Sequence, residues 1–166
     1  MKFLNSTNTL TLRYLPKHII SPVALRYLAS PINPIRFKIK HLYDNRDRNT
    51  LWWKVSTQHL TQHKRVIRSW CARRVRLAFR CALKERGFDA EGRRRGPNID
   101  ESAGISKGEN DNLVGSVDIF IRPRCVHEDY PTLQAEMNTL VDSFIQNINE
   151  GNRAKSPQDQ AAEVSK

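Results

Sequence analysis

Two stretches of the chain alternate between apolar and polar residues in the way half-buried strands do. In residues 35–40 (IRFKIK), every second residue is apolar and every residue between is cationic, which predicts a strand with a wholly basic outer face. In residues 113–121, apolar residues again recur at every second position, with Asp118 and Phe120 on the other face. Pro123, shortly after, is expected to end this second strand.

The longest helical signal lies in residues 51–86, which contain neither glycine nor proline and follow a turn cluster at residues 44–50. One straight helix of that length would measure about 54 Å, too long for a small domain. A break is therefore expected near residues 56–63. The second piece, residues 62–86, is the strongest predicted helix, and Gly87 is positioned to cap its end.

A helical wheel of residues 62–86 separates apolar from cationic positions. The predicted apolar arc consists of Ile67, Trp70, Cys71, Leu77, Ala78, Cys81 and Ala82, and the opposite arc of Arg65, Arg73, Arg76, Arg80 and Lys84. Phe79 and Leu83 fall outside this apolar arc, which predicts that they contact something other than the core.

A last helix is expected to begin near Pro131, since proline is favoured in the first turn. Apolar residues then recur at three- and four-residue spacing as far as Ile148, and Gly151 is expected to end the helix. Residues 88–112, rich in glycine and charge, predict a long disordered loop. Residues 149–166 predict a disordered polar tail.

This order of elements predicts one α+β domain (or a small α/β domain) over residues 35–148. We expect two or three strands with two to three helices, and flexible N- and C-terminal tails. Two strands alone make a poor sheet, so a third is expected from elsewhere in the chain or from a partner. Residues 29–34, with two prolines, predict a linker. No apolar run is long enough for a transmembrane helix.

The first 43 residues contain no acidic residue, and the cations Lys2, Arg13, Lys17 and Arg26 lie among leucine, serine and threonine. Such a composition is typical of a mitochondrial transit peptide. Residues 26–30 (RYLAS) resemble a matrix-processing site that is cut after Leu28. We therefore predict that residues 1–28 are a transit peptide and that the protein resides in the mitochondrial matrix. The alternative is a basic arm that stays attached.

Charge is distributed unevenly along the chain, whose net charge is +11. Residues 1–84 hold 18 Lys and Arg against two acidic residues, whereas residues 85–166 hold 10 against 15. So much positive charge opposes compaction unless a polyanion neutralises it, so nucleic acid or an anionic membrane is the first partner to consider. The binding surface must come from the first half.

The helix predicted at residues 62–86 concentrates this charge, with eight cations and no acidic residue between residues 64 and 84. Most are arginines, whose planar guanidinium suits phosphate. The predicted RNA-binding residues are Lys64, Arg65, Arg68, Arg73, Arg74, Arg76, Arg80 and Lys84, together with Arg93, Arg94, Arg95, Arg36, Lys38 and Lys40. The alternative is a solvated helix, or one paired with acids from the second half of the chain.

The residues that could support catalysis lack the necessary context. His59 and His63 are spaced like metal ligands on a helix, but no further ligand and no HExxH glutamate accompanies them. Three cysteines without paired spacing indicate a reducing compartment and not a disulfide scaffold. Cys125 near His127 matches no known nucleophile arrangement, and no glycine loop could cradle phosphate. We expect no enzyme activity, no metal and no cofactor.

Together these patterns predict a small, basic, non-catalytic RNA-binding protein, a mitochondrial ribosome component or a ribosome-associated factor. Its partners would be rRNA and ribosomal or other ribonucleoprotein neighbours. The alternative is a protein adaptor or assembly factor whose amphipathic helix at residues 137–148 docks a partner without binding RNA. Weak contact with an anionic membrane ranks third, because the Trp and Phe residues do not form one insertion face.

Overall fold

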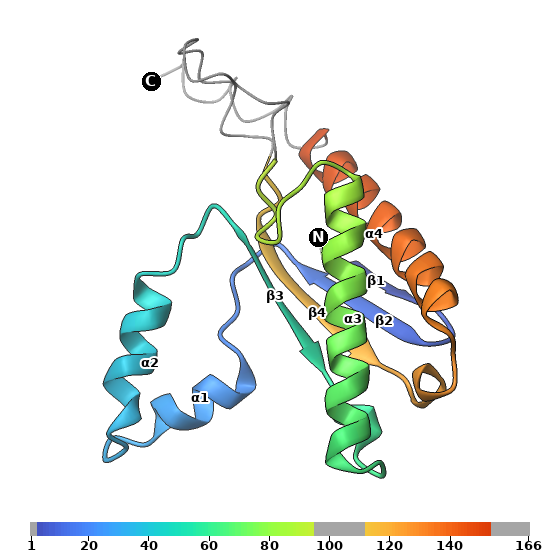
Figure 1. Ribbon diagram of the computed structural model, residues 1–166. Helices are drawn as coiled ribbons and strands as arrows, with labels where there is room; N and C mark the ends of the chain where they lie inside the picture. Colours follow the sequence, from blue (N-terminus) through green and yellow to red (C-terminus); the bar gives the residue numbers. More distant parts are fainter. Residues whose placement is uncertain (1–2, 95–111, 154–166) are drawn as a thin grey trace, which may run out of the picture.

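The computed structural model describes residues 3–94 and 112–153, which form a four-stranded sheet and four helices. The strands are β1 (Phe3–Ser6), β2 (Leu10–Leu15), β3 (Leu51–Ser56) and β4 (Gly115–Ile121). The helices are α1 (Pro22–Ala29), α2 (Ile35–Asp44), α3 (Arg65–Glu85) and α4 (Tyr130–Arg153), with short 3-10 turns η1 (Gln58–Leu60) and η3 (Pro123–Val126). Helices α3 and α4 cover one face of the sheet, and α1 and α2 form a separate hairpin (Figure 1).

Strand β4, the last in the sequence, lies inside the sheet, whose order is β1-β2-β4-β3. It pairs antiparallel with β2 and parallel with β3, so Ile119 lies beside both Leu12 and Val55. The hairpin β1–β2 extends the sheet on one side. Two strands from the first part of the chain therefore flank β4, which comes much later in the sequence.

The core lies between the sheet and the two long helices. Alternate residues of β2 and β4 face it, and both helices contribute one apolar face. The buried side chains include Leu10, Leu12 and Tyr14 of β2; Val117, Ile119 and Ile121 of β4; Cys71, Ala72, Val75, Ala78, Phe79, Ala82 and Leu83 of α3; and Leu133, Met137, Leu140, Val141 and Phe144 of α4. The other face of the sheet carries Thr11, Arg13, Asp118 and Phe120, which follows from the same alternation.

The α+β class is confirmed, but the expectation of two or three strands is wrong, because the sheet has four. The predicted elements at residues 62–86, 113–121 and 131–150 are confirmed as α3, β4 and α4. Gly87 follows α3 with a positive φ of 79°, as expected of a glycine cap. Helix α4 continues through Gly151 to Arg153, so it includes the start of the predicted tail at residues 149–166.

Two other local predictions are wrong. Residues 35–40 belong to α2, because Ile35, Ile39, Leu42 and Tyr43 also follow a helical spacing and gather on one side of a helix. Residues 51–56 form β3 and not a helix, which agrees with the aromatic and β-branched side chains of Trp52, Trp53 and Val55. Residues 95–111 of the predicted loop and residues 154–166 of the predicted tail lie outside the described residues.

The N-terminal residues contribute directly to the core. Leu10 and Leu12 are fully buried, and β2 lies between β1 and β4. Cleavage after Leu28 stays a prediction, but it would remove both strands and most of α1. Residues 29–34, predicted as a linker, connect α1 to α2.

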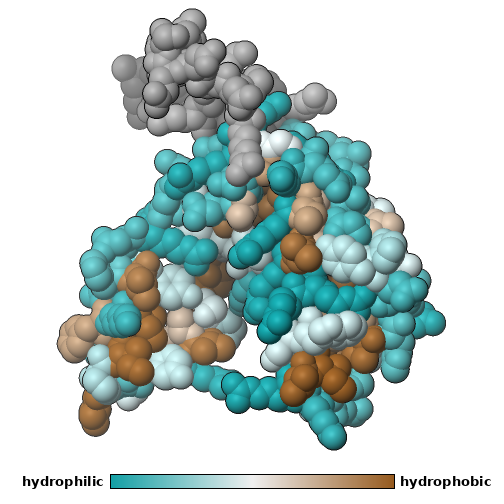
Figure 2. Space-filling model, in the orientation of Figure 1, coloured by the Kyte–Doolittle hydropathy of each residue, from teal (hydrophilic) through white to brown (hydrophobic). Residues whose placement is uncertain are grey.

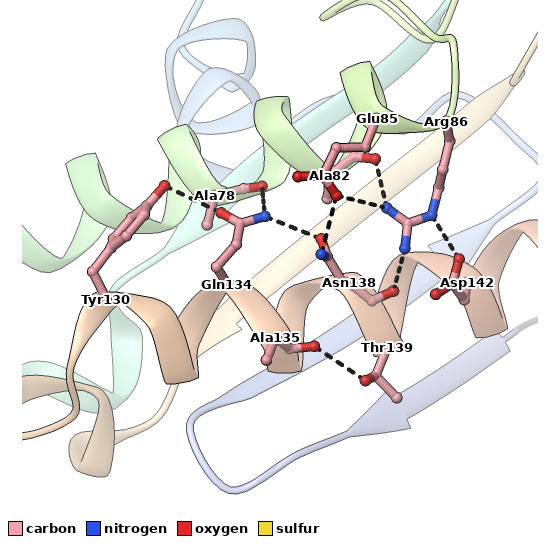
Figure 3. Close-up of polar contacts among 10 residues, drawn as sticks. All are labelled: Ala78, Ala82, Glu85, Arg86, Tyr130, Gln134, Ala135, Asn138, Thr139 and Asp142. Carbon is pink, nitrogen blue, oxygen red and sulfur yellow. Dashed lines mark hydrogen bonds and ion pairs between the residues drawn. The ribbon is translucent and has the colours of Figure 1, made fainter.

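A cluster of polar side chains joins α3 to α4 (Figure 3). The guanidinium of Arg86 donates to the carbonyl oxygens of Ala82, at 2.6 Å, and Asn138, at 2.9 Å. Its Nε atom lies 2.6 Å from Oδ1 of Asp142, and this hydrogen bond lowers the pKa of the Asp142 carboxyl. One arginine thus satisfies carbonyls of two helices and fixes the end of α3 against α4.

A second polar contact holds the β1–β2 turn on α4. Glu136 Oε2 accepts hydrogen bonds from the Thr7 hydroxyl at 2.6 Å, the Thr9 hydroxyl at 2.5 Å and the Thr9 backbone N–H at 3.1 Å. Burial opposes ionisation of Glu136, but these hydrogen bonds and the charge of Arg124 outweigh it and lower its pKa. The ionised carboxylate is therefore the form that the fold stabilises.

The substitution Leu12→Ala tests whether the first strands belong to the folded protein. Leu12 is fully buried, so its truncation should cost about 2–5 kcal/mol of unfolding free energy. Leu4 on β1 is 67% exposed, and Leu4→Ala should change stability by no more than about 0.5 kcal/mol. Urea denaturation measures both variants. Equal effects would contradict the position of β2 in the core.

Glu136→Gln tests the turn contact through the pH dependence of stability. A carboxyl whose folded-state pKa is lowered stabilises the fold above its ordinary pKa, and this contribution is lost as pH falls through the folded-state pKa. The variant should be less stable than the parent protein at neutral pH, and the difference should shrink in acid. Thermal melts of both proteins from neutral to acidic pH measure this difference in stability. A difference that does not change with pH would contradict the assignment.

Candidate nucleic-acid interface

Helix α3 presents most of its cations to solvent. Lys64, at its N-cap, is exposed, as are Arg65, Arg73, Arg76, Arg80 and Lys84, while Arg68 and Arg74 are half-buried. Figure 2 shows a strongly hydrophilic band over the middle of this helix. The outward orientation predicted for Arg73, Arg76 and Arg80 is confirmed.

The predicted apolar arc of α3 is partly wrong. Phe79 and Leu83, expected outside it, are fully buried, whereas Trp70 and Leu77 are 47% and 55% exposed. Apolar residues occupy positions around most of this helix, so a wheel alone does not determine which of them face the sheet. The outer face of α3 therefore combines arginines with a few large apolar side chains.

Arg74 is held within the protein and is not free to bind a ligand. Its guanidinium lies 4.3 Å from the centre of the Trp70 ring and donates a 2.8 Å hydrogen bond to the carbonyl oxygen of Glu128. The contact joins α3 to the turn before α4. Of the eight predicted cations in this segment, Arg74 thus has the clearest structural role.

Arg76 and Arg80 line a groove between α3 and the outer edge of β3, and Arg46 and Lys54 line the same groove. Trp53 forms part of its wall, with its ring centre 4.9 Å from that of Phe79. Four cations from three segments of the chain meet here, with Glu91 as the acidic residue of the lining. The groove thus has the charge of an anion-binding surface.

The ion pairs of Asp118 and Asp142 join these acidic residues to cations other than the eight between Lys64 and Lys84. Asp118 contacts Arg13, and also Lys54 at 3.2 Å, and Asp142 binds Arg86. Within residues 3–94 and 112–153, none of the eight cations between Lys64 and Lys84 forms an ion pair with an acidic side chain. The alternative of an internally paired helix therefore has no support in this part of the chain.

The remaining predicted RNA-binding residues lie in two other places. Arg93 forms ion pairs with Asp47 at 3.0 Å and Glu91 at 3.4 Å, and Arg94 is exposed beside it. Arg95 lies outside the described residues. Arg36, Lys38 and Lys40 are on α2, which Figure 1 shows separated from α3 by β3. The α2 cations and the α3 cations therefore form two separate groups.

The open face of the sheet holds a cluster that was not predicted from the sequence. Phe120 of β4 is half-buried, with the Arg13 guanidinium 5.4 Å from its ring centre and His59 at 6.1 Å. Arg122 and Arg124 line the same hollow. The signal was the position of Phe120 on the polar side of an alternating strand.

Two of the three cysteines considered as nucleophiles are shielded from solvent. Cys71 and Cys125 are buried in the core, and burial raises the pKa of the Cys125 thiol to about 12. A thiol with so high a pKa is not a nucleophile at neutral pH. Among the described residues, no three metal-ligating side chains lie close enough together to hold a metal ion, and this holds for the surroundings of His59 and His63 as well. None of the helices in that part of the chain combines the length and apolarity required to cross a membrane.

Two neighbouring arginines separate a structural from a surface role on α3. Arg74→Ala removes the contacts to Trp70 and Glu128 and should cost about 1–3 kcal/mol of stability. Arg73 is exposed, and Arg73→Ala should change stability by no more than about 0.5 kcal/mol. Thermal denaturation of both variants checks this, and a more damaging Arg73→Ala would refute it.

Comparisons of the chain with protein-family models, curated proteins and solved structures found no match.

Proposed function

We propose that this protein binds RNA without catalysing a reaction, and that the exposed face of α3 and the α3–β3 groove contact RNA phosphates. The main support is that the exposed cations of α3 have no acidic partners in the described segments. Arg46 joins Arg76 and Arg80 at the groove, and so does Lys54, which also pairs with Asp118. Unpaired like charges on one helix destabilise it, so an external polyanion is their natural counterpart.

The type of cation supports phosphate as the ligand. Arg76 and Arg80 are one helical turn apart and line the same groove, so two guanidinium groups can bind neighbouring oxygens of one backbone. The α3 helix, with 21 residues, is about 31 Å long and offers several such contacts in a row. A surface of this kind recognises charge and spacing and not the identity of the bases.

The finer part of the proposal assigns the protein to the mitochondrial matrix, as a ribosome component or a ribosome-associated factor that contacts rRNA. Its support is the net charge of +11, the acid-free first 43 residues and the small size of the domain. A basic protein that neutralises RNA phosphates gains affinity because counterions are released, which favours a partner rich in RNA.

The adaptor alternative requires that the apolar face of α4 be free to bind a partner. Met137, Leu140 and Phe144 on that face are fully buried against the sheet and α3. Strand β4 is paired on both edges, so it cannot accept a further strand. The described residues therefore give no support to docking through these elements.

The triple variant Arg73→Gln/Arg76→Gln/Arg80→Gln tests the proposed interface. All three side chains are exposed, so folding should be preserved, whereas affinity for RNA should fall by at least about tenfold. The slope of log affinity against log salt concentration should also become less steep, by roughly two to three units. Filter binding with mitochondrial rRNA fragments at several salt concentrations measures both.

The matched control removes the same charge from the hairpin, as Arg26→Gln/Lys38→Gln/Lys40→Gln. These three side chains are also exposed, so both variants lose three positive charges and both should still fold. RNA affinity should fall far less in the control. Equal losses would mean that RNA responds only to total charge, and retention of affinity by the α3 variant would refute the proposed interface.

A further inference from the structure

The α1–α2 hairpin extends away from the body of the protein and is attached to it mainly at its root (Figure 1). There the ring centre of Trp52 lies 4.6 Å from that of His18 and 5.7 Å from that of Tyr43. The Ile19 N–H also donates a 2.8 Å hydrogen bond to Ser116 Oγ on the central strand. The root is therefore fixed, while the rest of the hairpin is left to solvent.

The hairpin exposes large apolar side chains to an unusual degree. Ile32, in the turn between Pro31 and Pro34, is 91% exposed, and Phe37 in the first turn of α2 is 74% exposed. Further exposed apolar side chains on the two helices are Val23, Leu25, Tyr27, Ile35 and Leu42. Figure 2 shows hydrophobic patches on this hairpin. Exposed apolar residues at this density indicate a contact surface.

These side chains surround the hairpin and do not form one stripe. Val23 and Tyr27 are four residues apart and share a side of α1, whereas Leu25 lies on the opposite side. On α2, Ile35 and Leu42 share a side, and Phe37 lies opposite. A groove that takes one helix face would leave half of these residues in water. A fluid environment such as a lipid layer can instead contact every side of the turn between α1 and α2, and so bury all the apolar side chains close to that turn.

The positive charge of the hairpin indicates that such a lipid layer would be anionic. Residues 17–44 contain the cations Lys17, Arg26, Arg36, Lys38 and Lys40, and one acidic residue, Asp44, at the end of α2. Lys38 and Lys40 are exposed on α2, and Arg26 is exposed in the last turn of α1. An apolar end with cations behind it is the pattern of a segment that enters an anionic lipid surface. Tyr27 adds a side chain that favours the interface.

We propose that the tip of the α1–α2 hairpin inserts into the headgroup region of a bilayer that contains anionic lipids. Ile32 and Phe37 enter the apolar layer, and the basic side chains bind lipid phosphates. Helix α2 is about 15 Å long, so the contact is confined to one leaflet. This inference does not depend on RNA binding, because it uses residues of a separate element.

RNA alone does not account for this surface. RNA phosphates could form ion pairs with the cations of the hairpin, but they would not bury the apolar side chains of Ile32 and Phe37, whose exposure to water is unfavourable. Membrane insertion uses both kinds of side chain at once. Three of the hairpin cations, Arg36, Lys38 and Lys40, were predicted from the sequence to bind RNA, so RNA binding of the hairpin variants is measured alongside lipid binding.

Flotation of the full-length protein with vesicles tests the proposal. Phosphatidylcholine vesicles that contain phosphatidylglycerol should bind the protein, and vesicles of phosphatidylcholine alone should bind it weakly. Ile32→Ser/Phe37→Ser should lower partitioning into the anionic vesicles by at least about tenfold. The matched control is Leu4→Ser/Val66→Ser, which removes two apolar side chains that are 67% and 78% exposed elsewhere. The control should partition like the parent protein.

A second pair of variants separates the hairpin from α3. Arg26→Gln/Lys38→Gln/Lys40→Gln should reduce partitioning severalfold and leave RNA affinity nearly unchanged. Arg73→Gln/Arg76→Gln/Arg80→Gln should do the reverse. If only the α3 variant loses vesicle binding, the membrane contact is non-specific adsorption through α3 and the proposal is wrong. If the hairpin variants lose RNA affinity and keep vesicle binding, the hairpin is an RNA-contacting element and the proposal is likewise wrong.

A fluorescent probe reports directly on insertion of the tip. Ile32→Cys in a Cys81→Ser background carries an environment-sensitive dye, since the other two cysteines are buried. Anionic vesicles should shift its emission to shorter wavelength, and the same dye at Val66→Cys should not respond. Circular dichroism and thermal melts establish that each variant is folded. No shift at position 32, or an absence of vesicle binding by the parent protein, overturns the proposal.

Discussion

Pairing of β4 with two strands from the first third of the chain is the interaction on which the rest of the structure depends. Its backbone bonds to β2 on one side and β3 on the other, and Asp118 on its open face contacts Arg13 and Lys54 of those strands. The side chains on its opposite face are buried in the core, between the sheet and the two long helices. Without β4, the hairpin β1–β2 and strand β3 would have no strand between them and could not form one sheet.

The distribution of charge in the folded protein follows from how the acids are used. Asp118, Glu136 and Asp142 each fasten one part of the structure to another, through the sheet, the β1–β2 turn and the α3–α4 contact. Carboxylates used in this way cannot also neutralise the outer face of α3. That helix is held by its buried residues and by the Arg86 contact at its end. Arg74 adds to this anchoring, whereas the exposed cations of α3 take no part in it and remain available at the surface.

Periodicity predicted the elements that have one apolar face and a clear boundary. Gly87 after α3 and Pro131 in α4 marked such boundaries. Residues 35–40 fit both a two-residue and a helical spacing. Contacts that depend on the helix, such as the hydrogen bond between the Tyr43 hydroxyl and Ser21, involve residues outside this stretch. Leu10, Leu12 and Tyr14 alternate as a strand should, but the acid-free composition favoured a targeting segment. The groove beside α3 joins residues far apart in sequence, so no local pattern could reveal it.

The position of β4 also determines when the protein can fold during its synthesis. Arg13 and Asp118, which are 105 residues apart in sequence, lie beside each other in the sheet. Contacts of such long range make folding slow, because a long stretch of chain must first be ordered. The ribosome releases β1, β2, β3 and α3 well before β4, and until then their apolar faces have no core to join. Each nascent chain therefore passes through a stage in which the residues of its most basic helix, α3, have been synthesised but the sheet cannot yet form.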